Sequence, residues 1–208
     1  NKLIDMALDK AARMEKGKYH YPDDDAFLVV GGEGARLMQL DLSIHHSTVR
    51  PQKLLKNDGT IVTQIVESVR VADPSLAKSS KTFEDGTRFL TVRSFLSANA
   101  TRATDSMDGI DDCSTNNSTP CALRVISVPV LLAGMGGHYF IRDNEIHYEV
   151  AASHDKDFIV VEGANHGITP CTRCEQSPGQ YSNTVKNFFD YVAAWINGSF
   201  NGAPRFPK

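Results

Sequence analysis

The most constraining feature of the sequence is an apolar strand that runs into a histidine between two glycines. Residues 158–161 read Phe-Ile-Val-Val and are bounded by polar residues, which is typical of a strand covered on both faces. Gly163 and Gly167 flank His166, so the backbone can turn sharply there and direct the imidazole. The segment predicts a central strand with a histidine at its carboxyl end.

Three further segments extend this strand into a larger unit. Residues 125–134 have the same apolar character, and residues 143–153 between the two runs can form one helix. Residues 183–196 predict a second helix, whose apolar face would contain Val185, Phe188, Phe189, Val192, Trp195 and Ile196. Strand, helix, strand, histidine loop and helix form a βαβα unit, so we expect an α/β fold with a mainly parallel sheet.

This order of segments resembles the last third of an α/β-hydrolase. The similarity covers residues 124–200 and rests on the runs ISVPVLLAG, DFIVVEGANHG and NFFDYVAAWI. The family has a Ser-acid-His triad in chain order, with the histidine on the loop after the final strand. The resemblance therefore implies that His166 is the catalytic base, although a loop histidine that only packs or faces solvent is the alternative.

Two features depart from the family pattern. No G-x-S-x-G occurs in the chain, and the resemblance implies that this nucleophile motif would precede residue 1. The resemblance places the usual acid about three residues after the glycine that closes the strand, and counting from Gly134 this position is Gly137. Asp143, with Glu145 as the second choice, lies on the same connection and is expected to orient His166 instead. Asp143 is equally compatible with a helix N-cap.

The resemblance also implies a domain organisation. Residues 107–208 would form the C-terminal core with the histidine loop, and residues 1–106 would form a lid or cap and its connection to the core. Within that lid, residues 1–16 predict a helix, and residues 26–30 and 35–42 predict short strands. Residues 61–69 fit one helical face, while their β-branched content leaves a strand open.

Composition excludes several classes of protein. The chain has 208 residues with 41% hydrophobic and 23% charged side chains, as expected for a globular domain. Its formal charge of −3 argues against a nucleic-acid-binding protein, and no apolar run reaches the length of a membrane span. The adjacent His45 and His46 are a weak metal signal without further ligands at suitable spacing. We expect no cofactor and no metal.

The cysteines form two local pairs. Cys113 with Cys121, and Cys171 with Cys174, could make two short-loop disulfides or one four-thiolate zinc site. Potential glycosylation sequons favour the oxidised form, and they begin at Asn99, Asn116, Asn117 and Asn197. Paired cysteines and sequons together predict a secreted or periplasmic glycoprotein with two disulfides.

These observations give one leading functional hypothesis and two alternatives. We expect a serine hydrolase that cleaves a small-molecule ester, or less readily an amide, with His166 as general base. Its serine would come from the N-terminal half of the hydrolase, as a separate chain in a heteromer or as a missing segment. The first residue is Asn rather than Met, which is consistent with a processed chain or a fragment. The alternatives are a degenerate binding protein on the same fold, and a zinc or redox module built on the cysteines.

Overall fold

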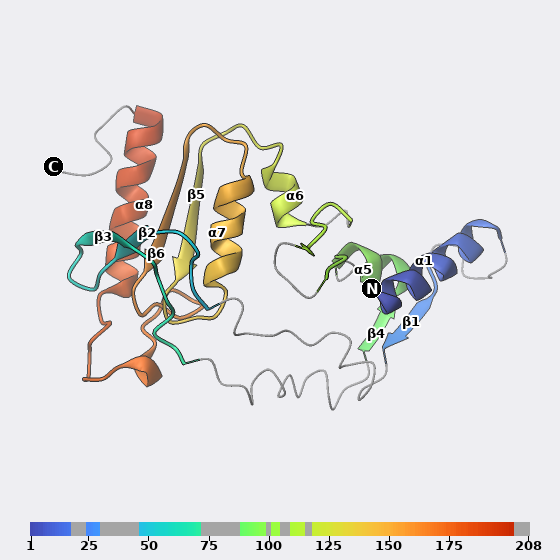
Figure 1. Cartoon of the computed structure of the whole chain (residues 1–208), viewed down its shortest axis with the longest axis horizontal. Coiled ribbons are helices and arrows are strands. Elements are labelled where there is room, and N and C mark those ends of the chain that lie inside the picture. The colour runs from blue at the N-terminus through green and yellow to red at the C-terminus, as the bar shows by residue number, and fades with distance from the viewer. Residues whose placement is uncertain are drawn as a thin grey trace. The chain divides into compact units, whose positions relative to one another are not determined.

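The computed structural model describes residues 1–17, 24–29, 46–71, 88–98, 101–104, 109–114 and 118–201. They form a mixed α/β structure with two sheets (Figure 1). The chain divides into unit 1, with residues Asn1–Asp41 and Pro74–Ala122, and unit 2, with residues Leu42–Asp73 and Leu123–Lys208. Residues 46–71 thus belong to the unit that contains His166, and the lid and core assignment stays a prediction. The strand expected at 35–42 lies outside the described residues.

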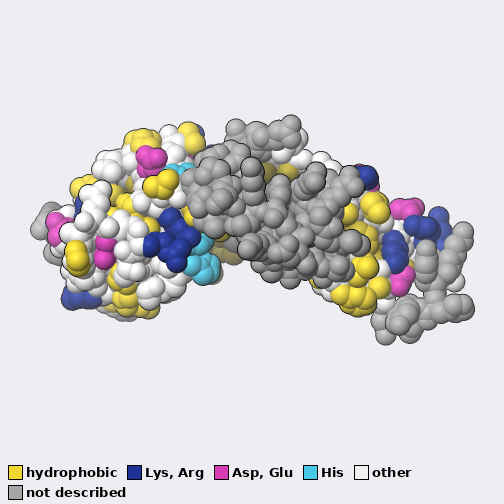
Figure 2. Space-filling view, turned by 90° about the horizontal axis from the view of Figure 1, so that it is seen from below, with side chains coloured by type: hydrophobic (Ala, Val, Ile, Leu, Met, Phe, Trp, Pro, Cys, Tyr) yellow, Lys and Arg dark blue, Asp and Glu magenta, His cyan; other side chains and the backbone are white. Residues whose placement is uncertain are grey.

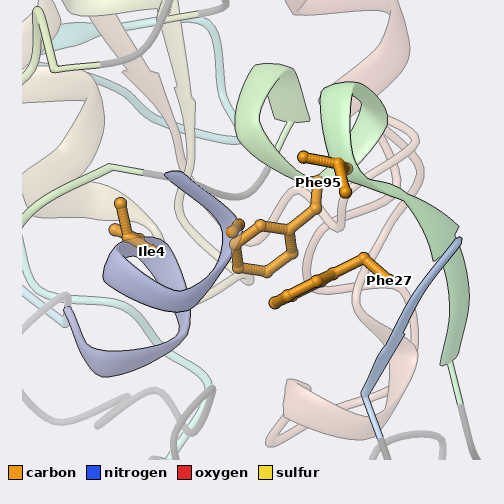
Figure 3. Close-up of a cluster of buried hydrophobic side chains, with 5 residues drawn as sticks. Ile4, Phe27 and Phe95 are labelled. Atoms are coloured by element: carbon orange, nitrogen blue, oxygen red, sulfur yellow. The ribbon is translucent and has the colours of Figure 1, made fainter. Parts of the chain in front are cut away.

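Unit 1 packs two helices against a two-stranded antiparallel sheet. Its main elements are α1 (Lys2–Glu15), β1 (Ala26–Val29), β4 (Arg88–Thr91) and α5 (Val92–Ala98). The helix expected at 1–16 and the strand expected at 26–30 are therefore confirmed. Ile4 and Ala7 of α1 are buried against Phe27, Val92 and Phe95, and the rings of Phe27 and Phe95 lie 4.7 Å apart (Figure 3). A short helix, α6 (Thr119–Leu123), spans the boundary between the units.

Unit 2 is built on a four-stranded sheet of order β3-β2-β6-β5. Its strands are β2 (Gln52–Leu55), β3 (Ile61–Gln64), β5 (Val130–Met135) and β6 (Lys156–Val161). Both β2 and β5 run parallel to β6, whereas β3 returns antiparallel to β2 through a turn at Gly59. The expected parallel pairing is present, but the sheet is mixed. The helical interpretation of residues 61–64 is wrong, because these β-branched residues form the hairpin strand.

The central strand β6 is buried on both faces, as its sequence predicts. Phe158 and Val160 pack with Leu54, Val66 and Ile141, the last from α7 (Ile141–Val150). Ile159 and Val161 point the other way, toward Leu55 and toward Tyr191 of α8 (Thr184–Asn201). Figure 1 shows α7 and α8 on opposite sides of the strands. The strict alternation along β6 therefore places one helix on each face.

Two expected boundaries and one expected face are corrected by the structure. The first core strand begins at Val130, after Pro129, and Val125 and Val128 are exposed. Proline has no N–H that could donate a hydrogen bond to a neighbouring strand, which explains why β5 starts after Pro129. The helix expected at 143–153 spans residues 141–150 instead. On α8 the buried side chains are Thr184, Tyr191 and Trp195, whereas three of the expected core residues are exposed, namely Val185, Phe189 and Ile196.

Phe95 is expected to be the main stabilising side chain of unit 1. Replacing Phe95 by Ala should cost about 3–5 kcal/mol of stability, because a fully buried ring leaves a cavity. Hydrogen exchange of the amides in α1 and α5 would measure the loss. Phe89→Ala is the matched control, since Phe89 is 73% exposed and should change exchange little. Equal effects of the two substitutions would contradict this account of the core.

Candidate functional site

The candidate site lies where the parallel strands β5 and β6 end. Their last residues, Met135 and Val161, are register partners, so the loops that follow them leave the sheet at the same edge. The backbone N–H of Gly136 donates to the carbonyl of Val161 at 2.8 Å, and the N–H of Gly137 donates to the carbonyl of Ala164 at 2.7 Å. Ligand sites of parallel α/β sheets characteristically form at this carboxyl edge.

The first of these loops needs its glycines for close approach. A Cβ on Gly136 would lie 2.7 Å from the carbonyl oxygen of Val161. A Cβ on Gly137 would lie 2.7 Å from the Cβ of Cys171 and 2.9 Å from the carbonyl oxygen of Ala164. Both contacts are too short for any side chain. The packing therefore explains why positions 136 and 137 carry no side chain.

The second loop places His166 at the tip of a closed turn. The N–H of Asn165 donates to the carbonyl of Thr169 at 2.7 Å, and the N–H of Ile168 donates to the carbonyl of Asn165 at 2.8 Å. The His166 N–H donates to the side-chain oxygen of Asn165 at 2.8 Å. The turn thus has a defined backbone, and the imidazole at its tip is exposed.

Only one of the two glycines that flank His166 is conformationally required. Gly163 has a φ of +64°, and a Cβ there would lie 2.1 Å from the ring of Tyr181. Gly167 has neither a positive φ nor an atom within 4 Å of a Cβ. The left-handed residue beyond His166 is instead Ile168, with a φ of 68°. The conformational freedom expected of the flanking glycines is therefore required at Gly163 and is not used at Gly167.

A second histidine, His138, lines a hollow together with His166. Their ring centroids are 5.1 Å apart, and the hollow has a volume of ≈ 290 Å³. It is lined by Ala133, Met135, His138, Phe140, Asn144 and His166. Figure 2 views the molecule from below Figure 1, toward the ends of β5 and β6, and shows histidine side chains beside a cluster of Lys and Arg. The hollow therefore combines apolar walls with imidazole and amide groups.

The charge state of His138 is set by its surroundings. Burial, then the neighbouring His166 and the guanidinium of Arg70, hold the pKa of His138 below its ordinary value. At neutral pH this imidazole is uncharged and has one nitrogen that can accept a proton. Sequence reasoning missed both His138 and Arg70. The position of His138 three residues after a strand end was the available signal, whereas nothing local indicated Arg70.

The two carboxylates expected to orient His166 occupy different environments. Glu145 is fully buried, and its oxygens accept hydrogen bonds from the N–H groups of Val49 and Arg50 at 2.7 and 2.9 Å. They also bond to the side chains of Gln52 and Arg142. Burial alone would raise the pKa of Glu145, but these bonds together lower it. Through these hydrogen bonds, Glu145 links α7 to residues 49–52.

Asp143 lies in the first turn of α7, one residue before Asn144, which lines the hollow. The helix itself begins at Ile141 with Phe140 as its N-cap, so Asp143 does not serve as that cap. In the described part of the chain, no carboxylate lines the hollow beside His166.

All four cysteines are in disulfides. Cys113 bonds to Cys121, and Cys171 bonds to Cys174 around the short helix η3 (Thr172–Cys174). Cys171 is buried, and its N–H donates to the carbonyl of Gly163 at 2.8 Å. The second disulfide is therefore attached by a backbone hydrogen bond to Gly163, before His166 in the histidine loop. It also leaves no thiolate for the zinc alternative.

The other expected sites are distributed as follows. Asn197 is exposed on α8, while Asn99, Asn116, Asn117 and His45 lie outside the described residues. His46 contacts the carbonyl of Arg70 and Glu67. No cluster of three or more metal-ligating side chains occurs among the residues that the structure describes.

Comparison with known proteins gives no match to any protein family, curated protein or solved structure. Among the described helices, none is long and apolar enough to cross a membrane.

The two flanking glycines make a matched pair for mutation. Gly163→Ala should destabilise unit 2 by at least about 1–2 kcal/mol from the left-handed backbone alone, with a further cost from the contact with Tyr181. Gly167→Ala should change stability by less than about 0.5 kcal/mol. Urea unfolding of both variants would measure the difference. Similar losses in both would show that the loop does not have the described backbone.

His138 should titrate below the usual histidine value of about 6.5, and this is measurable from its imidazole C–H signals in NMR. Arg70→Gln and His166→Gln should each raise the pKa of His138, because each removes a neighbouring positive charge. Between the lowered folded pKa and the unfolded pKa, the unfolded chain binds more protons, so this histidine destabilises the fold as pH falls through that window. His138→Gln should remove that part of the pH dependence. An unchanged His138 pKa in both charge variants would contradict the site geometry.

Proposed function

We propose that this chain is the lid and C-terminal core of a serine hydrolase that cleaves small-molecule esters, or less readily amides, with His166 as general base. The observation that carries the proposal is the position of His166. Its imidazole is exposed at the tip of a hydrogen-bonded turn, lies at the carboxyl edge of parallel strands and lines a hollow. A histidine in that position can take a proton from a hydroxyl nucleophile and return it to a leaving group.

The acid that orients His166 is best assigned to Asp143. Both oxygens of Glu145 are engaged by Val49, Arg50, Gln52 and Arg142, so turning that carboxylate toward His166 would leave several buried donors unpaired. Asp143 lies in the first turn of α7, one residue from the lining residue Asn144. A carboxylate bonded to the imidazole would fix its tautomer and stabilise the imidazolium.

The nucleophile is proposed to come from an N-terminal segment or partner chain that carries G-x-S-x-G. In the described part of the chain, β5 pairs with β6 along one edge and with no strand along the other. An apolar six-residue strand with an open edge favours pairing with a further strand. An N-terminal half that supplies that strand would also bring its serine to the carboxyl edge of the sheet.

A degenerate binding protein on the same fold is the second candidate. It is favoured by Gly137, whose packing against Cys171 and Ala164 excludes a side chain from the usual acid position. In either case, the two disulfides support a location in an oxidising compartment.

Hydrolysis of p-nitrophenyl acetate by the native particle that contains this chain tests the proposal. His166→Gln should reduce kcat/KM by roughly 10⁴-fold or more, because the general base is lost. His154→Gln is the control, since His154 is exposed on the turn before β6 and should leave the rate unchanged. An organophosphonate should label a serine in the wild-type particle. Full activity in His166→Gln would refute the hydrolase, and absence of both labelling and hydrolysis would favour the binding protein.

A further inference from the structure

Arg70 is a cationic side chain that packs on the loop carrying His138. Its guanidinium carbon lies 4.4 Å from the ring centroid of Tyr139, the residue after His138. The N–H of the preceding Val69 donates to the carbonyl of Gly136 at 2.8 Å, and the Arg70 carbonyl accepts a hydrogen bond from His46 at 2.6 Å. These contacts hold Arg70 against the loop that follows β5.

The charge of Arg70 is not neutralised by the residues that the structure describes. Within those ranges, its guanidinium contacts the Tyr139 ring and forms no ion pair. The carboxylate of Glu67, on the same segment, lies 3.6 Å from Nδ1 of His46. A guanidinium that stacks on an aromatic ring keeps its in-plane N–H groups free for an anion.

The hollow suits an apolar body, and Arg70 lies outside its lining, against Tyr139, the residue after the lining residue His138. Ala133, Met135 and Phe140 form its apolar wall, and the described lining contains no carboxylate that would repel an anion. The amide of Asn144 donates to the carbonyl of Phe140 at 2.5 Å, which leaves its oxygen as an acceptor. Because the pKa of His138 is lowered by burial, His166 and Arg70, the permanent positive charge at neutral pH belongs to Arg70.

We propose that the hollow binds a small organic carboxylate with an apolar body, and that Arg70 recognises its negative charge. Guanidinium and carboxylate match in shape and form charge-assisted hydrogen bonds. That this anion is the substrate or product of hydrolysis rests on the proposed function. The binding itself needs only the side chains of unit 2.

Titration of the full chain with phenylacetate tests the proposal, with the C–H signals of His138 and His166 in NMR as the readout. Phenylacetate should shift both sets of signals saturably. Arg70→Gln should weaken its Kd by about tenfold or more, the usual effect of losing a charge-assisted hydrogen bond. Phenylacetamide, which has the same body without the charge, should bind more weakly and equally to both proteins.

Two variants serve as controls. Arg50→Gln should leave the Kd for phenylacetate unchanged, because Arg50 is exposed and faces Glu149. Arg70→Lys should retain more affinity than Arg70→Gln, since it keeps the charge but loses the planar fork. Absence of a saturable shift, or equal Kd values for phenylacetate in wild type and Arg70→Gln, would overturn the proposal. Arg70-dependent binding by a particle that hydrolyses no ester would refute the proposed function alone.

Discussion

The structure of unit 2 depends on the contact between the two loops that follow β5 and β6. Two backbone hydrogen bonds join them, from Gly136 to Val161 and from Gly137 to Ala164. They form only because neither glycine has a side chain, so the loops meet at backbone distance. That contact sets the positions of His138 and His166 relative to each other, because each histidine follows within a few residues. The geometry of the candidate site is therefore a property of the backbone rather than of the histidines themselves.

Three carboxylates bring a distant segment to this sheet. Glu145, Asp157 and Glu162 come from α7 and from the two ends of β6, and all three bond to groups within residues 49–57. Asp157 accepts hydrogen bonds from Lys53 and from Tyr191 of α8, both at 2.6 Å. Buried carboxylates are stable only when such donors surround them. Residues 49–57 are therefore held at several points along β2, and a hydrogen bond from Val69 to Gly136 holds the residues before Arg70 at the carboxyl edge.

The local part of this arrangement could be predicted from the sequence. The apolar run of β6 and the helical spacing of α8 reflect burial and periodicity, which are visible in a short window. The insertion of β2 beside β6 could not be predicted, because its bonds to Glu145 and Asp157 join residues far apart in the chain. The positions of His138 and Arg70 in the candidate site could not be predicted for the same reason, because they depend on contacts between residues far apart in the chain. The buried face of α8 was also misjudged, since Val185 and Phe189 have the right spacing for a core that Thr184 and Tyr191 occupy instead.

The packing of Gly137 against Cys171 couples two positions that are far apart in sequence. A carboxylate at position 137 requires the space that the Cys171 side chain fills, and that side chain is held by its bond to Cys174. An aspartate introduced there would also meet the backbone carbonyl oxygens of Ala164 and Gly163, at 2.9 and 3.0 Å from its Cβ, so replacing the two cysteines would not make room for it. The crosslink on one side and the backbone of the histidine loop on the other therefore both require glycine at position 137.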